Sequence, residues 1–132
     1  GDASGLLVGV NLSMLYSLCG SASDIDTRGK LLFLEDLDEY LYHVDRMMMN
    51  LKRTGKLDNL AGLIVGGMSD MRDNTIPFGK DAEQIILEHT VEYGYPIYFS
   101  FEAGHQKLNK ALRFGLRAEI KDNRLLLSSN LA

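Results

Sequence analysis

The chain has 132 residues, of which 45% are hydrophobic and 24% are charged, and its formal net charge is −4. This balance predicts one globular domain, residues 1–132, with a hydrophobic core large enough to need neither bound metal nor disulfides. The single cysteine, Cys19, excludes a disulfide framework. No apolar run is long enough to cross a bilayer, and the mildly acidic chain has no basic cluster for nucleic acid, so we expect a cytoplasmic protein with neither kind of partner.

The first predicted elements are two strands with a short helix between them. Residues 6–10 form a short apolar run, and Asn11 supplies a capping side chain for a helix that extends to about Leu18. Residues 20–29 are small and polar and predict a surface loop. The apolar run at 30–34 predicts a strand buried on both faces.

A long amphipathic helix is predicted next, because apolar residues recur at helical spacing. The apolar stripe consists of Leu37, Tyr40, Leu41, Val44, Met47, Met48 and Leu51. The solvated face carries Asp36, Glu39, His43, Arg46 and Asn50. Gly55 ends the helix, and the two inward methionines are interpreted as gap-filling core residues.

The second half of the chain continues the alternation of strands and helices. Residues 60–67 predict another buried strand, and a polar loop follows at 68–79. The inward face of the next helix carries Ala82, Ile85, Ile86, His89 and Tyr93, with His89 interpreted as a hydrogen-bonded histidine at the core boundary. The last predicted elements are a strand at 97–101, a polar connection at 103–115, and a hairpin formed by 116–120 and 125–129.

This order of elements predicts an α/β layered domain. Strands that alternate with helices favour a mainly parallel core sheet with flanking helices, to which the terminal hairpin adds antiparallel edge strands.

Two titratable residues fall where a parallel sheet binds ligands, beyond the carboxyl ends of its strands. Glu35 follows the strand at 30–34, and His105 follows the strand at 97–101. A carboxylate that accepts a hydrogen bond from one imidazole nitrogen fixes the tautomer and leaves the other nitrogen free to act as a base. The two residues therefore match two members of a hydrolytic triad; the structural alternative is a helix cap at Glu35 and a turn at His105.

The sequence pattern supplies no convincing nucleophile and no metal site. Ser69 follows a strand, but the chain lacks the glycine two residues later that the G-x-S-x-G turn requires. Cys19 closes an apolar helix and is typical of a small core residue. Glu35, Asp36 and His105 are of metal-ligand type, but without H-E-x-x-H or a Cys/His cluster we expect no metal and no cofactor.

Four segments carry a resemblance to a known family. Residues 32–47 read L-F-L-E-D-x-x-E-x-x-Y-x-x-D-R-M. The others are Gly9-Val10-Asn11-Leu12-Ser13, Gly66-Gly67-Met68-Ser69-Asp70, and Gly104-His105 with Asn109 and Gly115. In this order they resemble the C-terminal domain of the LD-carboxypeptidases, the muramoyltetrapeptide carboxypeptidase family of serine peptidases. Two departures are Val10, in place of a glycine, and the lack of a proline before Gly115.

The resemblance implies a swivelling β/β/α fold and a triad in the order Ser, Glu, His, with Glu35 and His105 as its second and third members. The serine and its oxyanion donors belong to an N-terminal domain of the family that is absent here, so we expect the fragment alone to be inactive. The implied reaction is metal-free hydrolysis of the L,D peptide bond that releases terminal D-alanine from murein tetrapeptides during cytoplasmic cell-wall recycling, by a homodimeric enzyme.

Three alternatives remain open. Relatives in the family cleave microcin-type peptidyl nucleotides instead of murein peptides. A non-catalytic binding or docking domain of the same fold would retain Glu35 and His105 only as a cap and a turn. A self-contained hydrolase would need Ser69 close to His105.

Overall fold

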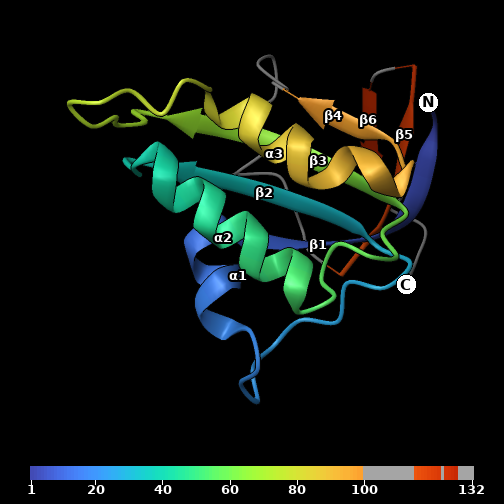
Figure 1. The fold of residues 1–132 in the computed structure, drawn as a ribbon. Coiled ribbons are helices and arrows are strands. Elements are labelled where there is room, and N and C mark those ends of the chain that lie inside the picture. Colours follow the sequence, from blue (N-terminus) through green and yellow to red (C-terminus); the bar gives the residue numbers. More distant parts are fainter. Residues whose placement is uncertain (100–114, 123, 128–132) are drawn as a thin grey trace.

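The structure is a computed structural model that describes residues 1–99, 115–122 and 124–127. Strands and helices alternate along the chain until a terminal pair of strands. The elements in chain order are β1 (Ala3–Asn11), α1 (Leu12–Leu18), β2 (Leu31–Leu37), α2 (Leu41–Arg53), β3 (Gly62–Ser69), α3 (Ala82–Thr90), the short 3-10 helix η1 (Val91–Tyr93), β4 (Ile97–Phe99), β5 (Arg117–Lys121) and β6 (Arg124–Leu127) (Figure 1).

The strands of the described residues form one sheet in the order β4-β3-β2-β1-β5-β6. The first four are mutually parallel, whereas β5 pairs antiparallel with β1 and β6 pairs antiparallel with β5. The predicted parallel core with an antiparallel edge hairpin is confirmed. Because β1 to β4 run in the same direction, their carboxyl ends meet at one edge of the sheet, which we call the carboxyl edge (Figure 1).

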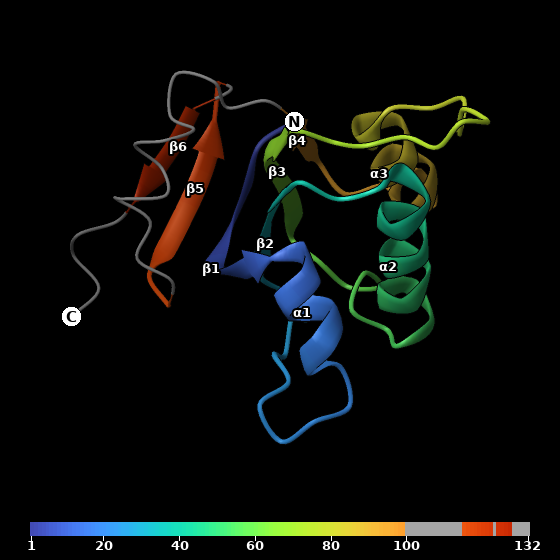
Figure 2. The same ribbon diagram turned by 90° about the vertical axis from the view of Figure 1, so that its left-hand side faces the viewer.

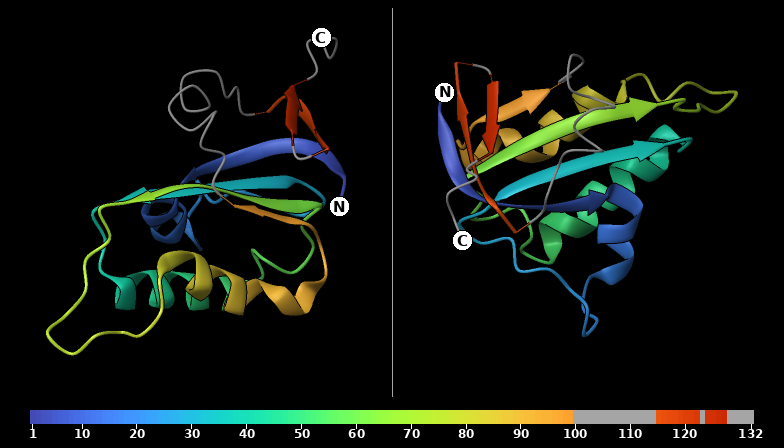
Figure 3. Two further views of the ribbon diagram at one scale, coloured as in Figure 1. Left: turned by 90° about the horizontal axis from the view of Figure 1, so that it is seen from above. Right: turned by 180° about the vertical axis from the view of Figure 1, so that it is seen from behind.

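The molecule has three layers. All three α-helices cover one face of the parallel strands, and the β5–β6 hairpin curls over the opposite face (Figures 2 and 3). Each face has its own hydrophobic core: Leu32 and Leu34 of β2 pack with the helices, whereas Leu31 and Phe33 pack with Ala118 of β5. Since successive strand residues point to opposite faces, this double burial explains why the run at the start of β2 is continuously apolar.

The boundary between β2 and α2 differs from the prediction. Leu37 ends β2, pairs with Ser69 of β3 and is 59% exposed, so it is not the first residue of a buried helical stripe. Tyr40 is the N-cap of α2 and is also exposed, and the left-handed backbone at Asp38 (φ 60°) separates strand from helix. The helical spacing of the first two apolar residues is therefore a coincidence. The rest of the stripe is confirmed, and Val44, Met47, Met48 and Leu51 are buried.

Pairing with distant segments extends two strands beyond their apolar runs. The first strand begins at Ala3 instead of residue 6, because Ala3 pairs with Ile120 of the hairpin. The third continues to Ser69 instead of residue 67, because it stays paired with Leu37. These extensions depend on partners far along the chain, which a local pattern does not reveal.

The predicted short helix is confirmed as α1, whereas the helix predicted to include Tyr93 ends at Thr90 as α3, and Tyr93 belongs to η1. Asn11 caps α1 by accepting a hydrogen bond from Met14 N, and Asp81 with Gln84 forms a capping box at the start of α3. Gly94 follows η1 in the left-handed conformation (φ 77°) that glycine adopts without strain. In the described parts of the chain, no helix is both long enough and apolar enough to span a membrane.

Candidate active site

Glu35 lies near the carboxyl edge of the sheet, but it is a residue of β2 (Leu31–Leu37) and does not follow the strand as predicted. Its backbone pairs with Asn11 at the end of β1, and its side chain is partly buried. Strand alternation places this side chain on the same face as Phe33, which is the hairpin face, away from the helices. Glu35 is therefore not the helix cap of the structural alternative.

A β-bulge lies directly opposite Glu35. Leu34 pairs with Val65 but Asp36 pairs with Met68, so two glycines, Gly66 and Gly67, face the single residue Glu35. Bulges of this kind bend a strand and redirect side chains, and they are frequent next to active sites.

Gly66 also makes room for the side chains beside it. A Cβ atom built on Gly66 would lie 2.5 Å from Phe33 Cζ and 3.5 Å from Glu35 Cβ. The first distance is too short for any side chain, so glycine is needed here for close packing. The glycine-rich segment that resembles the family's strand end therefore has a structural role next to Glu35.

His105 lies outside the described residues, and so do Asn109 and residues 111–114. Strand β4 ends at Phe99 on the carboxyl edge, and His105 follows further along the sequence. The pairing of Glu35 with His105 stays a prediction.

The prediction that Asp36 lies on the solvated face of a helix is wrong. Asp36 belongs to β2, is only 6% exposed, and points to the helix face of the sheet, opposite to Glu35. Its carboxylate accepts hydrogen bonds from Asn11 Nδ2 (3.0 Å), Leu37 N (2.8 Å), Ser13 N (3.0 Å) and Ser13 Oγ (2.5 Å). Asp36 thus joins the end of β2 to the end of β1 and the first turn of α1.

Glu39 and His43 extend this polar network toward α2. Glu39 Oε1 lies 3.2 Å from Ser13 Oγ, and Glu39 Oε2 lies 2.9 Å from His43 Nδ1. Because an ionised carboxylate only accepts, Nδ1 carries the proton of this bond. The His43 side chain is 31% exposed and meets the Tyr16 ring edge-on at 5.9 Å, so the histidine predicted to be solvated is partly buried.

The segments after β2 and β3 remain paired beyond the strands. Leu41 N donates to Arg72 O (2.9 Å), and Arg72 N donates to Glu39 O (2.8 Å). The Asp38 carboxylate binds the guanidinium of Arg72 through Nε (2.5 Å) and Nη2 (2.8 Å), which raises the pKa of Arg72. This pairing holds the segments that follow β2 and β3 together at the carboxyl edge.

The other residues singled out in the sequence have structural surroundings. Ser69 is exposed at the end of β3, and its position relative to His105 stays untested. Cys19 is the C-cap of α1, and its thiol donates to Leu15 O (3.3 Å). His89 is 8% exposed and its Nε2 lies 2.7 Å from Asp45 Oδ1, which confirms the predicted hydrogen-bonded boundary histidine. Among the residues that the structure describes, no three potential metal ligands of the His, Cys, Asp or Glu type come together.

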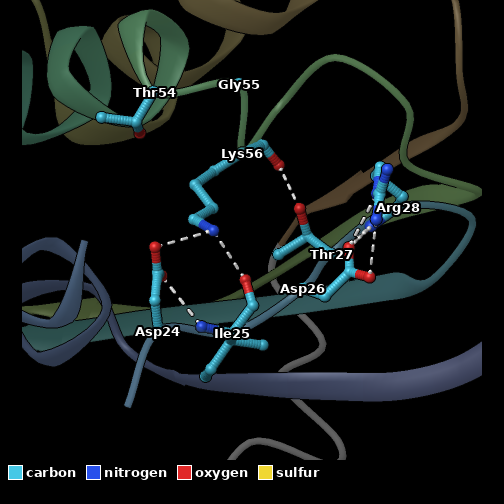
Figure 4. A pocket seen from close by; sticks show the side chains of 8 residues that line it. All are labelled: Asp24, Ile25, Asp26, Thr27, Arg28, Thr54, Gly55 and Lys56. Carbon is cyan, nitrogen blue, oxygen red and sulfur yellow. Dashed lines mark hydrogen bonds and ion pairs between the residues drawn. The ribbon is translucent and has the colours of Figure 1, made fainter. Parts of the chain in front are cut away.

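A polar pocket at the opposite edge of the sheet has a structural role (Figure 4). Lys56 Nζ, at the turn after α2, donates to Ile25 O (2.8 Å) and forms an ion pair with Asp24 (3.0 Å), while Thr27 Oγ1 donates to Lys56 O (2.7 Å). The backbone N–H of Gly20, ahead of other donors, lowers the pKa of Asp24. The predicted loop at 20–29 is therefore fastened to the end of α2.

Comparison with known proteins identifies the class of this domain. The family model for the LD-carboxypeptidase C-terminal domain matches residues 4–120, and the chain belongs to this family. A probable murein peptide carboxypeptidase of Bacillus subtilis (strain 168) is 40% identical over 122 residues, which cover 89% of this chain and 37% of the relative.

Two solved structures have the same fold as this chain. The muramoyltetrapeptide carboxypeptidase of Oxalobacter formigenes superposes with a TM-score of 0.75 at 26% identity, over 96% of this chain and 44% of that one. The microcin C7 self-immunity protein MccF superposes with a TM-score of 0.79 at 21% identity, over 100% of this chain and 40% of that one, which shows a shared fold. The chain spans less than half the length of each of these relatives.

The sequence pattern does not predict the polar network that holds the end of β2 on the helix face. The helical spacing predicts Asp36 on a helix, and Ser13 has no predicted role of its own, although both lie inside the motifs that carry the family resemblance. The available signal was the presence of a second carboxylate directly after Glu35, together with two hydrogen-bonding residues, Asn11 and Ser13, at the end of the neighbouring strand.

Proposed function

We propose that this chain is the C-terminal part of a serine LD-carboxypeptidase and contributes the acid and the base of its triad. Glu35 is the acid and His105 the base, and the nucleophilic serine belongs to an N-terminal domain outside this chain. The observation that carries the proposal is the position of Glu35 at the carboxyl edge, opposite a two-glycine bulge, in a chain that matches the family model over residues 4–120.

The chemistry follows from the two side chains. His105 takes the proton of the serine hydroxyl as its oxygen attacks the scissile carbonyl, and then delivers that proton to the departing amine. Glu35 accepts a hydrogen bond from the other imidazole nitrogen, which holds the ring in the correct tautomer and stabilises the imidazolium. This division of labour leaves the serine and the oxyanion donors to the other domain.

The names of the relatives support a murein peptide as the substrate. One is called a murein peptide carboxypeptidase and another a muramoyltetrapeptide carboxypeptidase. We therefore propose release of terminal D-alanine from murein tetrapeptides during cell-wall recycling in the cytoplasm, by a homodimer. An N-terminal domain is consistent with the 37% to 44% of these two relatives that the chain covers.

The test uses the full-length enzyme and measures release of D-alanine from a murein tetrapeptide. We expect His105→Ala to lower kcat about 10⁴-fold and Glu35→Gln about 10² to 10⁴-fold, with KM within roughly threefold of wild type, because both groups act on the transition state.

Glu119→Gln is the control, since it removes the charge of an exposed carboxylate on β5. A His105→Ala enzyme that keeps more than about a tenth of the wild-type rate would refute the assignment and favour a docking domain.

A further inference from the structure

Asp36 is a buried carboxylate that the proposed mechanism does not use. It follows Glu35 directly and is only 6% exposed. A buried ionised carboxylate is unfavourable unless its oxygens are hydrogen-bonded, so its surroundings must offset the loss of water.

The surroundings of Asp36 satisfy both of its oxygens. Asn11 Nδ2 and Leu37 N donate to Oδ1, and the backbone N–H and hydroxyl of Ser13 donate to Oδ2. All four donors lie at the carboxyl edge, at the ends of β1 and β2 and the start of α1. An ionised carboxylate accepts from all of them, whereas an asparagine would turn an N–H₂ group toward two donors.

These hydrogen bonds hold the backbone of β2 to β1, the neighbouring strand with which its pairing is regular. Glu35 pairs with Asn11 of β1, but on its other side the β3 ladder is interrupted by the bulge at Gly66 and Gly67. The direction of the Glu35 side chain therefore depends on the β1 side. One residue further along β2, the Asp36 carboxylate accepts a hydrogen bond from the side chain of the same Asn11 and so holds β2 to β1.

We propose that Asp36 is a positioning residue for Glu35: its four hydrogen bonds to the ends of β1, β2 and α1 fix the backbone from which Glu35 reaches the catalytic imidazole. This inference rests on the proposed function of Glu35. Asp36 points to the face of the sheet opposite to Glu35, so the proposed role is to hold the strand and not to take part in the reaction.

The test is a double-mutant cycle in the full-length enzyme. We expect Asp36→Asn to lower kcat about 10- to 100-fold with KM within roughly threefold, as is usual for residues that orient a catalytic group. In a Glu35→Gln background the same change should cost less than about twofold, because the residue through which Asp36 acts is already gone. Equal losses in the two backgrounds, or a single-variant loss below about threefold, would overturn the positioning role.

The pH profile separates positioning from loss of folded protein. A Glu35 carboxylate that no longer reaches the imidazole stabilises the imidazolium less, so the acid limb of kcat/KM should move to lower pH in Asp36→Asn, as in Glu35→Gln. A lower plateau with an unmoved acid limb is the result of a merely structural role and would overturn the proposal.

Ser13→Ala keeps the test decisive if Asp36→Asn fails to fold. It removes one of the four donors and leaves the Ser13 backbone N–H in place. We expect kcat to fall about 2- to 10-fold with the same shift of the acid limb, and an enzyme with wild-type kcat and acid limb would overturn the proposal.

Failure of the proposed function has a separate signature. A Glu35→Gln enzyme that keeps its rate excludes a catalytic Glu35, whatever Asp36→Asn does. Glu119→Gln serves again as the charge-matched control and should leave both kcat and the acid limb unchanged.

Discussion

At the scale of single residues, the space around Glu35 depends on Gly66. Replacement by alanine would place a methyl group against the Phe33 ring, since the built Cβ lies 2.5 Å from Phe33 Cζ. Phe33 is 2% exposed and packs in the core beneath the hairpin, so its ring has little room to move.

We therefore expect Gly66→Ala to destabilise the fold by about 1–3 kcal/mol and to lower kcat, as overpacking displaces the strand that carries Glu35. Thermal unfolding and D-alanine release by the full-length enzyme measure the two effects. Phe33→Leu combined with Gly66→Ala makes room for the methyl group and should recover part of the stability. No recovery in the double variant would show that the Phe33 contact is not the cause.

Glu35 and Asp36 show how far the sequence predicts individual sites. The end of an apolar run predicts that Glu35 follows a strand, whereas Glu35 lies inside β2, close to the carboxyl end of that strand. The sequence around Asp36 is compatible both with the outer face of a helix and with a further residue of the preceding strand. Helical spacing of apolar residues does not reveal where that strand ends. Its burial depends on donors from Asn11 and Ser13, which the fold brings next to it, and the local pattern does not contain that information.

At the scale of elements, the loop at 20–29 depends on a carboxylate that ionises at low pH. The pKa of Asp24 is lowered, chiefly by the N–H of Gly20 and also by Lys56. Because the folded pKa lies below the unfolded value of about 4, the stabilisation from Asp24 is present above that pH and is lost as the pH falls through the folded pKa.

We expect Asp24→Asn to speed amide hydrogen exchange across residues 20–29 by roughly threefold to tenfold at pH 6, and the difference from wild type to shrink as the pH falls below about 4. Mass spectrometry of the exchanged peptides measures both values. Glu119→Gln, far along the chain on β5, should leave this loop unchanged. A difference that persists at full size at pH 3 would contradict the assignment to the Asp24 carboxylate.

The elements themselves are largely readable from the sequence. Five residues of the α2 stripe and the capping residue Asn11 appear in the structure as expected, because each signal is local. The start of β1 and the end of β3 cannot be predicted from the local sequence, since the pairings of Ala3 with Ile120 and of Ser69 with Leu37 join distant segments.

At the scale of the whole molecule, the three layers mean that residues at the carboxyl edge have different surroundings on the two faces of the sheet. The helices cover one face of the sheet and the hairpin covers the other (Figure 3). By strand alternation, Asp36 is buried toward the helices while Glu35 points to the hairpin side. The alternation of strands and helices predicts the parallel core and the hairpin, but the hairpin's curl over the sheet depends on the second core beneath Ala118 and Ile120. The polar connection that carries His105 lies outside the described residues.

The central claim is that this chain supplies an acid and a base to a serine that lies in another domain. The most direct measurement is to treat the full-length enzyme with a fluorophosphonate and to locate the adduct by mass spectrometry. We predict one modified serine, in the N-terminal domain, with labelling slowed at least about 100-fold by Glu35→Gln. An adduct on Ser69 with enzymatic turnover, or labelling of the N-terminal serine at an undiminished rate in Glu35→Gln, would contradict the account.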